Sequence, residues 1–171
     1  MDTHEMMPLM TASGLDFYPM APSPLDVDIE DIAHALANTC RYGGHARSFY
    51  SVAQHSVLVS RALPPNLRRW GLLHDAAEAY VGDIPRPLKR HLQGYAEIEA
   101  TVMGCIAIAL NLRPLVMPDE VKQVDNAIIA DEAKALMPER SRTWPGAEDA
   151  LGIEIDPWSP GKARAAFLME Y

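Results

Sequence analysis

The sequence predicts an all-α protein, a compact helical bundle in a single domain that covers residues 1–171. Apolar residues recur at steps of three and four along most of the chain, which is the period of a helix with one buried face. No segment sustains the alternation of apolar and polar residues that indicates a half-buried strand. A chain of 171 residues with 49% apolar residues can form one substantial core but is too short for two domains that each have a substantial core.

The helices are delimited by capping residues and by breaks at proline and glycine. Residues 1–24 are expected to be an irregular lead-in, since they lack a period and contain three prolines near their end. Ser51 and Asn66 each suit the N-cap of a helix, and Ser159-Pro160 opens the last one. Residues 138–171 are expected to be a loop centred on Trp144-Pro145-Gly146, followed by that short helix. The predicted helices span approximately 28–43, 51–63, 66–81, 87–92, 95–110, 118–137 and 159–171.

Composition and charge exclude several classes of protein. The net charge of −8 argues against a nucleic-acid duplex as partner, because binding many phosphates requires a basic surface. The longest clean apolar run, Met103 to Leu110, is too short to cross a bilayer, and no export signal opens the chain. Cys40 and Cys105 are too few for a disulfide framework. A cytoplasmic protein without a membrane partner is expected.

The adjacent pair His74-Asp75 is the most informative candidate for chemistry. Neighbouring residues on a helix point about 100° apart, so both side chains can coordinate a cation that lies beside the helix. Glu78 is four residues after His74 and therefore on the same flank, within reach of water on that cation. The alternative is a helix surface with a solvated aspartate and glutamate.

Two residues from other predicted helices strengthen the interpretation as a metal site. Asp125 is on the edge of an apolar stripe, where a carboxylate loses most of its water and needs a cation or several donors. His55 lies on an apolar face between Val52 and Val59. The alternatives are a carboxylate held by hydrogen bonds or an arginine, and a core histidine. Two histidines and two carboxylates together suit one divalent transition ion, Co²⁺, Mn²⁺ or Zn²⁺.

The order of His55, the His74-Asp75 pair and Asp125 resembles the metal signature of the HD superfamily of phosphohydrolases. The resemblance runs from about Leu25 to Leu136 and rests also on the segments 31–34, 41–45, 49–56 and 72–89. It is to the branch that includes bacterial 5′-deoxynucleotidases and phage-type dATP triphosphohydrolases. The resemblance implies an HD-type bundle in which these four residues are the ligands of a single metal ion.

The resemblance also implies roles for five further residues. Glu78 matches the family's catalytic glutamate, and Asp83 matches a second acid that relays a proton or protonates the leaving group. Arg41 and Lys89 match cations that bind phosphate, and Tyr42 matches an aromatic residue near the sugar or base. The alternatives are a turn aspartate for Asp83, a cation at a helix C-terminus for Arg41 and a solvated lysine for Lys89. For Tyr42, the alternative is an ordinary core or surface aromatic residue.

The expected function is therefore hydrolysis of small nucleotides by a cytoplasmic, metal-dependent phosphohydrolase. A phage-encoded protein of this kind would act in the cytoplasm of the host cell. Release of triphosphate from dATP or a related dNTP is the leading reaction, and removal of phosphate from a dNMP is the alternative. A metal-stabilised helical scaffold without catalysis is an alternative from another class, which the presence of Glu78 and Asp83 argues against. The resemblance further implies a homo-oligomer.

Overall fold

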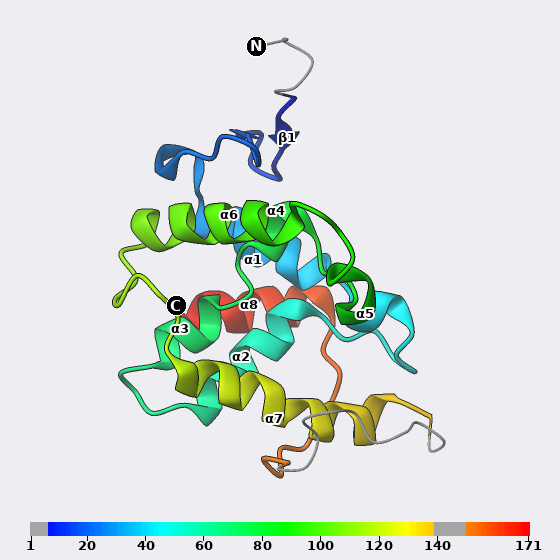
Figure 1. The fold of residues 1–171 in the computed structure, drawn as a ribbon. Helices are drawn as coiled ribbons and strands as arrows, with labels where there is room; N and C mark the ends of the chain where they lie inside the picture. The colour runs from blue at the N-terminus through cyan, green and yellow to red at the C-terminus, as the bar shows by residue number, and fades with distance from the viewer. Residues whose placement is uncertain (1–6, 139–149) are drawn as a thin grey trace.

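The computed structural model describes residues 7–138 and 150–171, which are mostly helical, in agreement with the predicted all-α fold class (Figure 1). In chain order, the elements are β1 (Leu9–Met10), β2 (Asp16–Phe17), the 3₁₀ helix η2 (Pro24–Asp26), α1 (Ile29–Asn38), the 3₁₀ segment η3 (Arg41–Gly44), α2 (Val52–Ala62), α3 (Arg68–Leu73), α4 (Glu78–Val81), α5 (Arg86–Lys89), α6 (Tyr95–Ala109), α7 (Asp119–Leu136) and α8 (Pro160–Glu170).

The C-terminal helix occupies the middle of the bundle. α8 packs against both α1 and α2, α2 packs against α3, and α7 lies along α2 and α3 (Figure 1). On the other side of α1, α4 contacts both α1 and α6. The main core is formed by buried side chains from these helices, among them Ile32, Leu36, Val52, Val57, Val59, Trp70, Leu72, Leu73, Val102, Ile106, Val121, Ile128 and Phe167. The site described below lies where α2, the segment after α3, and α7 meet.

Two of the three helix starts expected from capping residues are confirmed. Ser51 Oγ accepts a hydrogen bond from the Gln54 amide at 3.1 Å, and Ser159 caps α8, with Pro160 as the first helical residue. The expected cap at Asn66 is wrong. α3 begins at Arg68, and its N-cap position is Leu67, which makes no side-chain capping bond.

The first helix ends earlier than predicted, at Asn38 and not near Gly43. Both the amide and the hydroxyl of Thr39 donate to the Ala35 carbonyl, at 2.9 and 2.8 Å, and Thr39 itself is extended. Cys40 then forms an isolated antiparallel bridge with Ser51. Because α1 ends at Asn38, residues 41–44 form the separate 3₁₀ segment η3, which contains the candidate site residues Arg41 and Tyr42.

The helix predicted after Asn66 is divided into α3 and α4. His74 Nδ1 donates to the Gly71 carbonyl at 2.7 Å, and that carbonyl would accept the Asp75 amide in a continuous α-helix. The amides of Ala76 and Glu78 instead bond three residues back, as in a 3₁₀ turn. The prediction that Glu78 shares one regular helix with His74 is therefore wrong, although the two remain close in sequence and space.

The lead-in is more ordered than predicted in its described part. β1 and β2 pair in an antiparallel ladder of two residues each, too short to leave a periodic pattern in the sequence. The buried Phe17 ring stacks on Tyr80 of α4 with 3.7 Å between ring centroids. Asp31 of α1 accepts hydrogen bonds from the amide and hydroxyl of Ser13. The hairpin thus packs against α4 through the contact of Phe17 with Tyr80.

The C-terminal loop follows the prediction where it is described. Residues 150–159 have no regular structure, whereas Trp144-Pro145-Gly146 lies outside the described residues. The Gln54 side chain holds the loop against α2: it donates to the Asp156 carbonyl at 2.7 Å and accepts from the Trp158 amide at 2.8 Å.

In the part of the chain that the structure describes, no helix is both long and apolar enough to cross a membrane. The apolar run from Met103 to Leu110 belongs to α6, where Cys105 and Ile106 are buried. Cys40 and Cys105 are both free.

The close approach of α2 and α3 depends on Gly71. A Cβ at this position would lie 2.4 Å from Leu63 Cδ1 and 3.0 Å from Ser60 Cα, so Gly71→Ala should force the helices apart. We expect it to lower the free energy of unfolding by about 1–3 kcal/mol, measured by chemical denaturation. Gly104→Ala is the control, because a Cβ there meets nothing within 4 Å and alanine should stabilise α6 by about 0.4–1 kcal/mol. Equal stability of the two variants would contradict the described packing.

Candidate metal centre and adjoining cavity

The four predicted metal ligands converge. His55 comes from α2, His74 and Asp75 from the turn after α3, and Asp125 from α7. One ligand atom from each lies within 4.8 Å of all the others. His55 Nε2 is 3.3 Å from His74 Nε2 and 3.1 Å from Asp125 Oδ1, and His74 Nε2 is 3.2 Å from Asp75 Oδ2. The predicted convergence is confirmed.

These separations fit a shared cation. Around an ion with metal–ligand distances of about 2.1 Å, neighbouring ligand atoms lie about 3.0 Å apart at right angles and about 3.4 Å apart in a tetrahedron. Two further pairs, His74 Nε2 to Asp125 Oδ1 at 3.6 Å and His55 Nε2 to Asp75 Oδ2 at 3.7 Å, are close to the same range. The cluster could therefore bind a metal ion.

Hydrogen bonds on the far side of each imidazole fix its orientation. The Gly71 carbonyl can only accept, so His74 Nδ1 carries the proton in their 2.7 Å contact. His55 Nδ1 lies 2.7 Å from Glu132 Oε1, and this carboxylate likewise acts as an acceptor. Each neutral imidazole then presents the Nε2 lone pair to the cluster, and two lone pairs 3.3 Å apart need a cation between them.

The two carboxylates of the cluster are held ionised. Burial alone would raise the pKa of Asp75, but the His74 imidazole outweighs it and lowers this pKa to about 2. Burial opposes ionisation of Asp125 in the same way, and hydrogen bonds with His55 and His74 lower its pKa well below the ordinary value. Burial also disfavours the charged form of His74, yet the two carboxylates raise the pKa of His74 well above its ordinary value. In the absence of a metal, a proton on His74 thus balances part of the negative charge.

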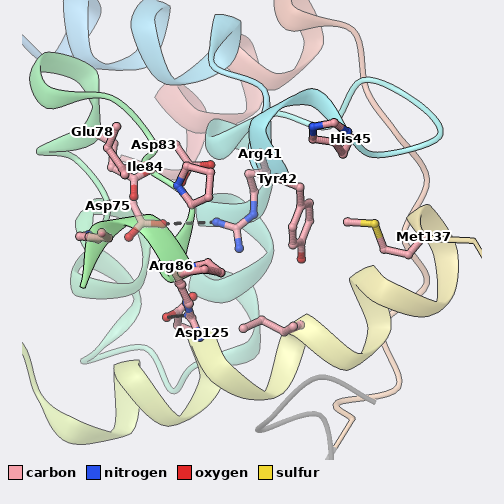
Figure 2. Close-up of a pocket in the computed structure, with 14 residues that line it drawn as sticks. Arg41, Tyr42, His45, Asp75, Glu78, Asp83, Ile84, Arg86, Asp125 and Met137 are labelled. Carbon is pink, nitrogen blue, oxygen red and sulfur yellow. Dashed lines mark hydrogen bonds and ion pairs between the residues drawn. The ribbon is translucent and has the colours of Figure 1, made fainter. Parts of the chain in front are cut away.

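A cavity of about 410 Å³ adjoins the cluster (Figure 2). Asp75 and Asp125 face it, whereas His55 and His74 are buried behind them. All five further residues predicted for the site line it as well. The lining consists of Arg41, Tyr42, His45, Asp75, Glu78, Asp83, Ile84, Pro85, Arg86, Pro87, Lys89, Asp125, Ile129 and Met137.

Glu78 and Asp83 place two acids on the cavity wall with raised pKa values. Burial raises the pKa of Glu78 well above its ordinary value, and the charges of Asp75 and Asp83 add to this effect. Oε2 of Glu78 is buried and has no hydrogen-bond partner among the described residues. Burial likewise raises the pKa of Asp83, against the opposing charge of Arg41. Acids with raised pKa values in a cavity wall are candidates for proton transfer.

Arg41 and Tyr42 of η3 form a further part of the cavity wall, next to Asp75. The Arg41 guanidinium makes an ion pair with Asp75 at 3.5 Å (Figure 2). It makes a second ion pair with Glu132 at 3.3 Å and lies 5.4 Å from the centre of the Tyr42 ring. The alternative of a cation at the end of the first helix is wrong, because α1 ends at Asn38. Tyr42 has φ 59°, a left-handed conformation that is uncommon outside glycine, and its hydroxyl bonds to Glu132. Arg41 is thus held by two acids, and its buried Nε finds no partner in residues 7–138 and 150–171.

Two more cations lie at the rim of the cavity, and both are paired. Lys89 Nζ is 2.5 Å from Glu99 Oε1, so the alternative of a merely solvated lysine is wrong. Arg86 contacts Asp125 Oδ2 at 3.2 Å and Asn126 Oδ1 at 3.1 Å. Arg86 therefore bonds to the second oxygen of a cluster carboxylate.

Sequence reasoning missed Glu132, a buried acid that bonds to both the cluster and the cavity wall. It lies on α7, seven residues after Asp125, which is two turns along the same helix face. Its pKa falls to about 2, because burial is outweighed by the charge of Arg41 and by the contacts with His55 and Tyr42. Extending the helical phase of Asp125 along 119–136 would have identified it.

The convergence predicts that the protein binds one divalent transition ion through Asp125. We expect Asp125→Asn to weaken Co²⁺ or Zn²⁺ binding by more than about 100-fold, beyond the effect of losing a supporting group. Asp119→Asn, at the exposed start of the same helix, should leave the affinity unchanged. Isothermal titration calorimetry on metal-stripped protein measures both. Equal affinities in the two variants would remove Asp125 from the site.

Two known proteins are similar to this chain in sequence. The chain is 39% identical over 166 residues to the uncharacterized protein YfdR of Escherichia coli K12, an alignment that covers 95% of this chain and 93% of that protein. It is also 39% identical over 116 residues to the uncharacterized protein RCAP_rcc00048 of Rhodobacter capsulatus, covering 62% and 59% of the two chains. No protein-family model matches. The nearly full-length similarity to YfdR shows that the chain belongs to the same protein family as YfdR.

Proposed function

We propose that this chain is a metal-dependent phosphohydrolase of the HD type that acts on small deoxynucleotides. The observation that carries the proposal is the position of the cluster, whose two carboxylates line a cavity that Glu78 also lines, with one oxygen of Glu78 buried and without a hydrogen-bond partner among the described residues. The order of the motifs along the chain, which resembles the HD superfamily, supports the same conclusion. The leading reaction is hydrolysis of dATP or a related dNTP to deoxynucleoside and triphosphate.

The ligand set suits one borderline divalent ion, Co²⁺, Mn²⁺ or Zn²⁺, since it combines two imidazoles with two carboxylates. When bound, such an ion supplies Lewis acidity, which polarises a phosphoryl oxygen and makes water more acidic. The protein's own residues supply the proton transfers. A carboxylate whose pKa is raised by burial is suited to accept a proton from the attacking water, and Glu78 is such a group on the cavity wall.

The leaving group requires a proton in return. In release of triphosphate, the water oxygen bonds to the α-phosphorus, the bond from that phosphorus to the 5′ oxygen breaks, and the 5′ oxygen becomes a hydroxyl. Glu78 receives the proton of the water, and Asp83 donates a proton to the 5′ oxygen. The raised pKa of Asp83 favours its protonated form, which suits it to this role.

The rest of the cavity suits a nucleotide. Its volume of about 410 Å³ is in the range of small-molecule sites. Arg41 places a guanidinium on the cavity wall, and Arg86 and Lys89 add positive charge at the rim. The apolar part of the wall, which suits a base and a deoxyribose, consists of Ile84, Pro85, Pro87, Ile129 and Met137.

Removal of phosphate from a dNMP is the second candidate, and the pairing of the cations favours it. Arg41, Arg86 and Lys89 each already contact an acid. The positive charge that stays available suits a single phosphate better than a triphosphate, which would need further cations for its β- and γ-phosphates. The pairs of Arg86 and Lys89 are partly exposed, however, and pairs of this kind are worth at most about 1 kcal/mol. A polyphosphate can therefore take over both cations.

A scaffold without catalysis is the weakest candidate. Burying a carboxylate oxygen without a partner costs free energy, and a purely structural protein gains nothing from Glu78 in that position. The cost is understandable where the oxygen binds a water or a substrate.

A substrate panel tests the proposal and distinguishes its two reactions. Metal-stripped protein, reloaded with Co²⁺ or Mn²⁺, is incubated with dNMPs, NMPs, dNTPs and NTPs, and the products are separated by ion-exchange chromatography. We expect triphosphate and deoxynucleoside from dATP or another dNTP. Orthophosphate from dNMPs alone would select the second candidate. Absence of any product from protein that has bound metal would favour the scaffold.

Glu78→Gln tests the proton transfer. Glutamine keeps the shape of the side chain but cannot accept the proton, so we expect kcat to fall by about 10²- to 10⁴-fold while folding and Co²⁺ affinity are retained. Glu97→Gln, on the exposed face of α6, is the matched control and should keep full activity. Normal turnover in the Glu78 variant would exclude this residue from the mechanism.

A further inference from the structure

Glu132 is completely buried, and its carboxylate is surrounded by side-chain donors. Oε1 receives hydrogen bonds from His55 Nδ1 at 2.7 Å and from the Tyr50 hydroxyl at 2.9 Å. Oε2 receives them from Arg41 Nη2 at 3.3 Å and from the Tyr42 hydroxyl. A carboxylate has about four acceptor sites, so all of them are used.

The four donors belong to different parts of the site. His55 faces the metal cluster, Arg41 and Tyr42 line the cavity, and the buried Tyr50 stands between these groups in sequence. The two oxygens of one side chain therefore hold the metal ligand on one side and the cavity wall on the other. Neither α2 nor η3 provides another carboxylate in this position among the described residues.

We propose that Glu132 is the positioning residue that couples the metal centre to the substrate-binding wall. Through Oε1 it sets the tautomer and ring direction of His55, and through Oε2 it sets the directions of Arg41 and Tyr42. Metal binding and substrate binding thereby depend on the same carboxylate. This inference rests on the proposed function, since it assigns a role in that metal site.

The neighbouring acid on the same helix shows what a structural carboxylate looks like here. Asp131 is also buried, but the hydrogen bonds described for it come from the backbone amides of Leu151 and Gly152, at 2.9 and 3.2 Å. It holds the C-terminal loop on α7. Glu132, by contrast, receives its bonds from side chains of the candidate site. Asp131 is thus a matched control for burial, charge and position.

Glutamine at position 132 would separate the two functions of the carboxylate. Its amide has one oxygen acceptor, so two of the four donors lose their partner whichever way the amide turns. A supporting group of a metal-bound histidine typically contributes about 10- to 100-fold to metal affinity. Glu132→Asp retains the charge on a shorter side chain and should recover part of the affinity.

The first measurement is Co²⁺ affinity, by titration of metal-stripped protein, together with the visible absorption spectrum of bound Co²⁺. We expect Glu132→Gln to bind Co²⁺ about 10- to 100-fold more weakly and with a changed spectrum, Glu132→Asp to lie between this variant and wild type, and Asp131→Asn to match wild type in both. Circular dichroism identifies variants that have not folded. If Glu132→Gln does not fold, the comparison of Glu132→Asp with Asp131→Asn decides.

The second measurement is the dependence of turnover on nucleotide at saturating Co²⁺. We expect KM to rise in Glu132→Gln more than kcat falls, because Arg41 and Tyr42 lose their fixed direction. Wild-type Co²⁺ affinity and spectrum in the folded Glu132 variants would overturn the inference and leave the proposed function intact. Failure of wild-type protein to bind Co²⁺ would instead overturn the proposed function itself.

Discussion

Charge compensation between three separate chain segments is the constraint on which the site depends. Asp75 and Asp125 are largely removed from water, and contacts with the imidazoles of His55 and His74 lower the pKa values of both carboxyl groups. An uncompensated charge in such surroundings is strongly destabilising, so α2, the turn after α3, and α7 must keep their mutual positions. Glu132 and Arg41 extend the same balance toward the cavity. Burial of charge here fixes a geometry more than it adds stability.

The cluster adjoins the cavity through its two carboxylates. The histidines form its buried back, held through their Nδ1 atoms by Glu132 and by the Gly71 carbonyl. The carboxylates form its front and are part of the cavity wall. A ligand in the cavity would therefore lie beside Asp75 and Asp125, with Glu78 and Arg41 on the same cavity wall. This arrangement would suit a reaction in which a metal ion held by the cluster and a nearby acid act on the same bond.

Breaks in regular structure create much of the site. The α3 helix stops because the His74 side chain takes a backbone carbonyl, and the tighter turn that follows carries Asp75. α1 stops at Asn38, and the left-handed conformation of Tyr42 turns η3 toward α7. Such conformations are more costly than helix, and the contacts of Arg41 and Tyr42 with Glu132 help to retain them.

The sequence by itself determined the helical class, most helix positions and the residues of the metal cluster. Helical periodicity and capping are local properties, and inward-facing polar residues such as His55 and Asp125 stand out against an apolar pattern. The tertiary structure alone decided which groups compensate one another. The pairing of Arg41 with Asp75 and the contacts of Glu132 join residues up to 91 positions apart. Contacts over such distances leave no periodic signal, because they form only when separate helices pack together.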